Sequence, residues 1–208
     1  MSNELTVQRL LATATEEFRG YGYGGTDVNR IARRSGMAPT TFYRCFKDKL
    51  DIFLAVHEQW MIREKLLLRV LLTLPASDAE LAETCVGHHR DHLPFRRSLR
   101  QLAYEEPRMR QARARTRLEI IAEIRAWRGE QVADDSRMAS DLIQMERLAD
   151  ALAEGEFADM GLDERQARQD LADVLRRFRL QTAPAANAAQ PEGLPGNDTL
   201  ADDEALTA

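Results

Sequence analysis

Apolar residues recur at helical spacing along most of the chain. The first segment has steps of three and four residues between its apolar positions, which are Val7, Leu10, Leu11, Ala14 and Phe18. This spacing places them on one face of a helix. The same pattern predicts later helices over about 78–92, 95–105, 107–129, 136–159 and 163–180. The sequence shows no strand-like alternation with turn residues, so it predicts an all-α protein.

Two short helices and one long helix are predicted after the first segment. Thr26 is a suitable N-cap for the first short helix, which ends at Ser35-Gly36. The second begins at about Pro39, because proline suits the first helical position. Asp48 is the expected cap of the long helix, which continues as far as Leu74-Pro75.

The turn between the two short helices has the composition of a helix-turn-helix. Ala32 allows close approach of the helices, Gly36 can take a left-handed conformation, and Met37 fills the space between them. In that motif the second helix lies in the major groove of DNA. The sequence therefore predicts an N-terminal domain of three helices that binds double-stranded DNA.

Charge is distributed unevenly along the chain, whose net charge is -5. Residues 1–74 carry 11 basic and 8 acidic side chains, whereas residues 181–208 carry five acids and no base. The last segment also holds three prolines and few large apolar side chains. We therefore expect 181–208 to form a disordered acidic tail, since it buries too little surface to offset the entropy of ordering.

The cellular compartment is predicted from the cysteines and from the signal and membrane segments that the sequence does not show. Its cysteines are Cys45 and Cys85, and no signal-peptide core follows Met1. No apolar run approaches the roughly 18 residues that would span a bilayer. We expect a cytoplasmic protein with no membrane partner.

Two runs of residues near the N-terminus carry a family resemblance. The first is made of Phe18, Gly22, Tyr23, Thr26, Val28, Ile31, Ala32 and Gly36, and the second of Thr41, Phe42, Tyr43, Phe46, Lys49 and Leu50. In type and spacing they resemble the TetR family of transcriptional regulators, over about residues 5–60. The later helices fit that family's effector-binding and dimerisation domain in number and length. The resemblance implies a DNA-binding domain over 1–49 and an effector-binding and dimerisation domain over 50–180, followed by the tail.

The resemblance also implies which residues contact DNA: Thr26, Pro39, Thr40, Thr41, Tyr43, Arg44 and Lys49. Thr26 and Lys49 fall where family members contact phosphate, and the other five lie on the recognition helix. Arg44 is the first candidate for reading a base, because its guanidinium can bond to guanine O6 and N7 together. Tyr43 has a core aromatic as its alternative interpretation, whereas Phe42 and Phe46 are expected in the core.

Part of this segment departs from the family's usual pattern. Ala38 stands where a serine cap is common, Pro39 where a basic residue is frequent, and Thr40 where glycine is usual. Cys45 replaces a more usual aromatic or histidine. These differences leave the fold unaffected and put the operator sequence in doubt.

The resemblance further implies a small-molecule effector, bound among the helices of 76–180. Candidate contacts, chosen for helical position and for aromatic or adaptable side chains, are His88, His89, His92, Tyr104, Trp127 and Met145. Each of them has ordinary core packing as its alternative interpretation. The expected function is a ligand-responsive repressor that the effector releases from its operator.

The last two long helices are the candidates for a homodimer interface. Their apolar faces contain Met138, Leu142, Met145, Leu148 and Leu152 on one helix and Leu171, Val174, Leu175 and Phe178 on the other. Two such helices per subunit could form a four-helix interface, and the alternative is intramolecular core. A two-fold dimer predicts a palindromic operator.

One cluster offers a second functional hypothesis. Cys85, His88, His89 and His92 lie within an arc of roughly 100° on one predicted helix, given about 100° per residue. Imidazole and thiolate are ligands for zinc, copper, nickel or cobalt, so a metal-responsive regulator is the alternative function. Lining of an organic-ligand pocket, or packing without function, are the other interpretations.

Two further patterns receive plain structural interpretations. Gly20, Gly22 and Gly25 match the spacing of a dinucleotide fingerprint, but a predicted helix precedes them where that motif needs a strand. We therefore expect no cofactor, and no catalytic motif indicates an enzyme. A basic run is formed by Arg108, Arg110, Arg113, Arg115 and Arg117. It predicts a solvated face with salt bridges, with a second nucleic-acid surface as the alternative.

Overall fold

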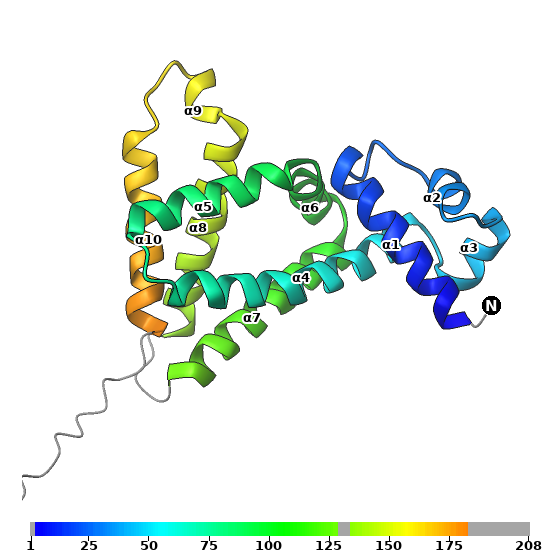
Figure 1. Ribbon diagram of the computed structural model, residues 1–208, viewed down its shortest axis with the longest axis horizontal. Coiled ribbons are helices and arrows are strands. Elements are labelled where there is room, and N and C mark those ends of the chain that lie inside the picture. The colour runs from blue at the N-terminus through cyan, green and yellow to red at the C-terminus, as the bar shows by residue number, and fades with distance from the viewer. Residues whose placement is uncertain (1–2, 129–133, 183–208) are drawn as a thin grey trace, which may run out of the picture.

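The computed structural model describes residues 3–128 and 134–182, with side chains described over 3–126 and 134–179. This part of the chain contains helices and no strands (Figure 1). The helices are α1 (Asn3–Tyr21), α2 (Val28–Arg34), α3 (Pro39–Cys45), α4 (Lys49–Thr73), α5 (Asp78–Asp91), α6 (Leu93–Glu105), α7 (Pro107–Arg128), α8 (Asp135–Glu154), α9 (Glu156–Asp159) and α10 (Arg165–Thr182). The predicted all-α class is confirmed. None of the described helices is both long enough and apolar enough to cross a bilayer.

Helices α1, α2 and α3 form a small head at one end of the molecule (Figure 1). Its centre is aromatic, because Phe18 packs edge-on against Phe53 at 4.9 Å between ring centroids and Tyr23 contacts Phe53 at 5.3 Å. Phe95 of α6 joins this group, 5.2 Å from Phe53. The head therefore shares its core with α4 and α6.

Capping residues set the boundaries of the helices in the head. Asp27 caps α2 by accepting a hydrogen bond from the Arg30 N–H, so the prediction of Thr26 as N-cap is wrong by one residue. Asp48 caps α4 as predicted, and it accepts the Asp51 N–H at 2.7 Å. Pro39 opens α3 as predicted.

The body is built around α4, which runs from the head to the far side of the molecule (Figure 1). Helices α5, α8 and α10 pack together there around a second apolar core. This core includes the faces predicted for the dimer, and Met138, Leu171 and Phe178 are fully buried within one chain. These faces are therefore intramolecular core, the alternative interpretation, and the homodimer itself stays a prediction.

Two helix boundaries in the body differ from the sequence prediction. The helix predicted over 136–159 ends at Glu154, because Gly155 takes a left-handed conformation with φ 78° and separates α8 from the short α9. Helix α6 begins at Leu93, two residues earlier than predicted, since proline is tolerated in the first turn. Of the tail predicted over 181–208, residues 181 and 182 are the end of α10, and the rest lie outside the described residues.

Candidate DNA-binding head and effector cavity

The turn between α2 and α3 has the predicted helix-turn-helix geometry. Gly36 has a φ of 72°, which is the left-handed region that favours glycine. The Met37 N–H donates to the Ala32 carbonyl at 2.9 Å and closes the turn. Ala32 is fully buried and Met37 packs against the core of the head, as the sequence predicted.

One face of α3 is exposed and the other is anchored. Phe42 is fully buried and Phe46 nearly so, which confirms both as core residues. Pro39, Thr40 and Arg44 are exposed, and Thr41 is half-buried. Tyr43 is 59% exposed, so its interpretation as a core aromatic is wrong. The helix therefore presents hydroxyls, a phenol and a guanidinium outward.

Thr26 is held inside the head by a buried carboxylate. Its hydroxyl donates to Glu17 Oε2 at 2.7 Å, and both side chains are buried. Glu17 also pairs with Arg30 at 2.7 Å and with Arg34. Burial alone would raise the pKa of Glu17, but the bonds from Arg34, Thr26 and Arg30 outweigh it and lower that pKa. Glu17 therefore ties α1 to α2.

Lys49 is also bonded within the head. Its ammonium donates to the backbone carbonyls of Tyr23 at 2.9 Å and Thr26 at 3.1 Å, and lies 4.0 Å from the centroid of the Tyr23 ring. Burial lowers the pKa of Lys49, and the charge of Asp27 opposes that shift. Lys49 therefore fixes the loop between α1 and α2 against the start of α4.

A cavity of about 110 Å³ lies in the body, beside α4. Its walls come from α4, α5, α6, α7, α8 and α10. The apolar lining residues are Trp60, Met61, Leu67, Leu68, Leu71, Leu72, Leu81, Cys85, Leu99, Ile120, Leu142, Met145 and Leu175. The polar ones are His57, Glu64, His88, His89, Arg96, Arg113, Thr116, Arg117 and Glu146. A largely apolar space with a few polar groups is typical of small-molecule sites.

The structure places the predicted effector contacts in three groups. His88, His89 and Met145 line the cavity. His92 is not among its lining residues, and the Tyr104 side chain is 87% exposed, so neither lies at this cavity and both stay untested as effector contacts. The Trp127 side chain lies outside the described residues.

Most of the charged side chains that line the cavity were not predicted from the sequence. Arg113 and Arg117 were expected on a solvated face, but both side chains are partly buried and share Glu146 of α8. Burial raises the pKa of Glu146, whereas the bond from Arg117 and the charges of both arginines lower it, with a net lowering. Arginines on the apolar side of a predicted helix could have indicated a buried charged pair. The run of arginines around Arg113 and Arg117 hid this pattern, because it made the whole helix look exposed.

His57 is the most deeply buried titratable group of the cavity wall that has no partner. It is 4% exposed, and neither ring nitrogen has a hydrogen bond within the part of the chain that is described. Burial lowers its pKa to about 4, and the positive charge of Arg113 acts in the same direction. The neutral imidazole therefore offers one donor and one acceptor to the cavity.

A groove on the outside of the body meets the cavity. It has a volume of about 460 Å³ and lies between α4 and α7. His57, Met61 and Thr116 line both the groove and the cavity. These three side chains therefore form the wall between them.

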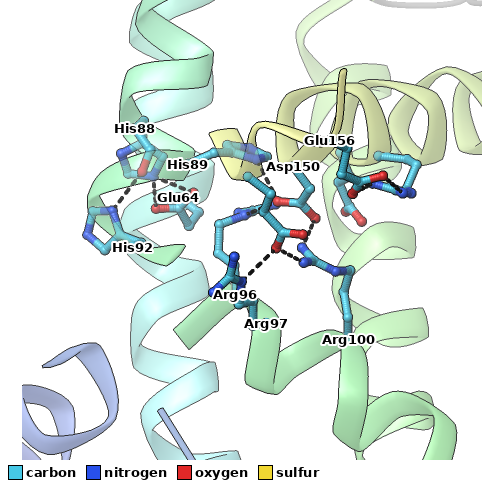
Figure 2. Close-up of polar contacts among 12 residues, drawn as sticks. Glu64, His88, His89, His92, Arg96, Arg97, Arg100, Asp150 and Glu156 are labelled. Atoms are coloured by element: carbon cyan, nitrogen blue, oxygen red, sulfur yellow. Dashed lines mark hydrogen bonds and ion pairs between the residues drawn. The ribbon is translucent and has the colours of Figure 1, made fainter. Parts of the chain in front are cut away.

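The four residues of the metal hypothesis are engaged separately. His89 Nδ1 donates to Asp150 at 2.8 Å, His88 Nε2 bonds to Glu64 at 2.8 Å, and His92 Nδ1 bonds to the His88 carbonyl at 2.9 Å (Figure 2). Burial raises the pKa of the Cys85 thiol to about 12, which keeps it protonated. No group of three or more metal-binding side chains is found among the described residues. The metal-responsive alternative is not supported.

Asp150 joins three helices behind the cavity. It accepts hydrogen bonds from His89 of α5 at 2.8 Å and from Arg96 of α6 at 2.7 Å, and pairs with Arg100 of α6 (Figure 2). Burial alone would raise the pKa of Asp150, but the hydrogen bond from His89 and the charge of Arg96 hold it below its ordinary value. A buried carboxylate with this many donors fixes the positions of α5, α6 and α8.

Helix α6 connects this cluster to the head. The Tyr23 N–H donates to Ser98 Oγ at 2.7 Å, and Ser98 donates to the Pro94 carbonyl at 2.8 Å. Gly22 has a φ of 69°, and a Cβ there would lie 2.9 Å from Ser98 Oγ. The loop after α1 is therefore packed directly on the helix that carries Arg96 and Leu99 of the cavity wall.

The head and the cavity together define a class of protein, a helix-turn-helix DNA-binding protein with an internal ligand cavity. Residues 10–56 match the family of bacterial regulatory proteins, tetR family. No curated protein matches the sequence. The matched segment contains the helix-turn-helix, so the resemblance seen in the sequence is confirmed.

Solved structures share the fold over most of the chain. A TetR-family regulator from Mesorhizobium loti is 19% identical, covers 86% of this chain and 96% of its own, and gives a TM-score of 0.55. One from a Rhodococcus species is 19% identical, covers 86% and 100%, and gives 0.52. FadR of Thermus thermophilus, a TetR-family repressor in complex with lauroyl-CoA, is 18% identical, covers 90% and 100%, and gives 0.50. The N-terminal segment 10–56 is therefore similar to the tetR family, and the fold over most of the chain is shared with solved TetR-family regulators.

Proposed function

We propose that the protein is a ligand-responsive repressor that binds a palindromic operator as a homodimer and leaves it when a small molecule occupies the cavity. The observation that carries the proposal is that one helix, α4, joins the head that carries α3 to the cavity. Helix α4 begins under the head and lines the cavity over much of its length. FadR of Thermus thermophilus, which has the same fold, is described as a repressor with a bound small molecule, and this supports the proposal.

The proposed DNA contacts form two groups, the residues on α3 and two residues that are bonded inside the head. Pro39, Thr40, Thr41, Tyr43 and Arg44 lie on α3, and we assign base reading to Arg44 because it is exposed and its guanidinium can bond guanine in two places. Thr26 and Lys49 keep their assignment to phosphate. Their bonds inside the head support a role in shaping the backbone that faces phosphate.

The proposed mechanism is a shift between two conformations. An effector that fits one arrangement of α4 and α6 better than the other stabilises that arrangement. Both helices contact the head, so the spacing of the two recognition helices in a dimer changes with them. When the two half-sites of an operator lie about one helical turn apart, both recognition helices can enter the major groove at only one separation between them.

Dimerisation and location belong to the same proposal. A two-fold pair of heads fits successive major grooves, and this supports a homodimer. The apolar faces of α8 and α10 are used inside one chain, so the interface lies elsewhere on the surface. A regulator of this kind acts where the chromosome is, which in bacteria is the cytoplasm. The division into 1–49 and 50–180 separates the DNA-binding and effector-binding roles.

The test is operator binding by the full chain, measured by fluorescence anisotropy on fragments from upstream of its own coding sequence. Arg44→Ala should relax sequence preference at one base pair and cost roughly 1 to 3 kcal/mol there. Lys49→Ala should weaken binding to all sequences alike, because it frees the loop whose carbonyls the ammonium holds. Arg90→Ala, which changes an exposed arginine at the end of α5, is the matched control. The proposal would be refuted if none of the fragments changed in anisotropy on addition of the protein at low salt.

A further inference from the structure

The lining of the cavity extends over about four turns of α4. Along α4 its lining runs from His57 to Leu72, a rise of roughly 22 Å at about 1.5 Å per residue. Its volume is only about 110 Å³. An engineered protein cavity of about 150 Å³ is known to hold a single benzene ring. A bulky fused ring system would therefore need more rearrangement of the lining side chains than a slender chain that follows α4.

The two ends of the cavity differ in chemistry. The end formed by the later turns of α4 is lined by Leu68, Leu71 and Leu72, with Leu175 of α10 added from the opposite side. These side chains offer no hydrogen bond. The other end, near the head, contains His57 of α4 and a group of charged residues from α7 and α8. The cavity is therefore polar at one end and apolar at the other.

The polar end has spare donors and an excess of positive charge. Two guanidiniums, Arg113 and Arg117, share the single carboxylate of Glu146. Arg117 bonds to it through both Nε and Nη2, but Arg113 makes one side-chain hydrogen bond, from Nη2 at 2.9 Å, within the described residues. The remaining donors of Arg113 and the unbonded imidazole of His57 can therefore meet an acceptor in the cavity.

We propose that the effector is an unbranched aliphatic acid, with its carboxylate at Arg113 and His57 and its chain along Leu68, Leu71 and Leu72. This inference rests on the proposed function, in which the cavity is the effector site. A carboxylate would complete the charge balance of the two guanidiniums and accept the spare donors of Arg113. The chain would replace water next to the leucines, which is favourable for each methylene buried.

Other ligand classes fit these observations less well. A neutral chain would fill the apolar end and leave the Arg113 donors without an anion. A cationic chain would place a third positive charge beside Arg113 and Arg117, which is unfavourable at short range. A chain esterified to a large nucleotide would hold its carbonyl group in a thioester, with no negative charge for Arg113.

The test is isothermal calorimetry on the full chain without DNA. The probes are octanoate, 1-octanol, octylamine and octanoyl-CoA, of which the first three share one chain and differ in charge. Octanoate should bind most tightly. Arg113→Gln should lower its affinity by about 10-fold to 100-fold, the usual range for a charge-assisted hydrogen bond, and leave 1-octanol nearly unchanged. Arg110→Gln, which changes an exposed arginine on the same helix, should leave octanoate binding unchanged.

A second variant keeps the test decisive if Arg113→Gln does not fold. His57→Leu preserves an apolar wall and removes the imidazole, so it should weaken octanoate and spare 1-octanol. The inference is overturned if octanoate does not bind, if 1-octanol, octylamine or octanoyl-CoA binds more tightly, or if both variants bind octanoate as the original chain does. Because no DNA is present, these outcomes are separate from a failure of operator binding or operator release.

Discussion

At the residue scale, burial decides the charge of His57. The imidazole is 4% exposed, and burial together with Arg113 lowers its pKa to about 4. An unfolded chain has a histidine pKa near 6.5. Between about pH 6.5 and pH 4 the unfolded chain therefore binds more protons at this residue than the folded chain does. The free energy of unfolding accordingly rises with pH through this window and falls as the solution is acidified.

The substitution His57→Leu removes the imidazole and with it the proton uptake that accompanies unfolding. The variant should lose less stability on acidification than the original chain, by up to about 3 kcal/mol between pH 7 and pH 4. Urea unfolding at several pH values, followed by circular dichroism, measures the difference. Above pH 7 the two curves should run parallel, which is the internal control. Parallel curves down to pH 4 would contradict the burial of a neutral imidazole.

Individual residues of the helix-turn-helix could be predicted because their roles are local. Gly36 and Met37 follow from the geometry of a tight turn, and Phe42 from the spacing of a short helix. Thr26 was assigned wrongly because threonine and aspartate both cap helices, and the neighbouring Asp27 takes the cap. The choice depends on Glu17, which binds the Thr26 hydroxyl from another helix. Such a contact is not visible in local sequence.

At the element scale, α6 is the shortest physical connection between the cavity and the head. Arg96 and Leu99 line the cavity, and Ser98 between them accepts the Tyr23 N–H. A Cβ added at Gly22 would meet Ser98 and Pro94 of the same helix, and Gly22 has a positive φ. A shift of α6 therefore acts directly on the loop between α1 and α2.

Two glycines of that loop make a matched pair for testing the connection. Gly22→Ala adds a Cβ that would lie 2.9 Å from Ser98 Oγ, at a φ that costs alanine roughly 1 to 2 kcal/mol. We expect a loss of about 2 kcal/mol in stability and a smaller effect of effector on operator binding. Gly24→Ala meets no heavy atom within 4 Å and should change stability by less than about 0.5 kcal/mol. Urea unfolding and operator titrations measure both effects, and equal behaviour of the two variants would contradict this role of the loop.

Helix positions could be predicted from sequence, but the partners of helix faces could not. The apolar spacing gave α5, α7 and α10 to within two residues at most ends. The same spacing cannot distinguish a face buried against another subunit from one buried within the chain, so the faces of α8 and α10 were misassigned. Arg113 was misassigned for a related reason. Its partner Glu146 comes from another helix, 33 residues away.

At the scale of the whole molecule, the proposed function requires that binding at the cavity and binding at the operator affect each other reciprocally. If an effector lowers operator affinity by some factor, the operator must lower effector affinity by the same factor. For coupled sites this factor is typically about 5 to 150. We therefore expect octanoate, or the effector identified in its place, to bind more weakly to the operator complex. Calorimetry with and without operator checks this, and equal affinities would exclude the proposed mechanism.

The thin wall between the cavity and the outer groove has a consequence for response time. His57, Met61 and Thr116 border both spaces, so rotation of these side chains, without separation of α4 from α7, would be enough to join the cavity to the groove. Rotation of side chains is faster than movement of packed helices, by several orders of magnitude. The time that the regulator needs to sense a falling effector concentration is then set by the lifetime of the bound contacts. Under the proposed function, repression would then return soon after the effector is consumed.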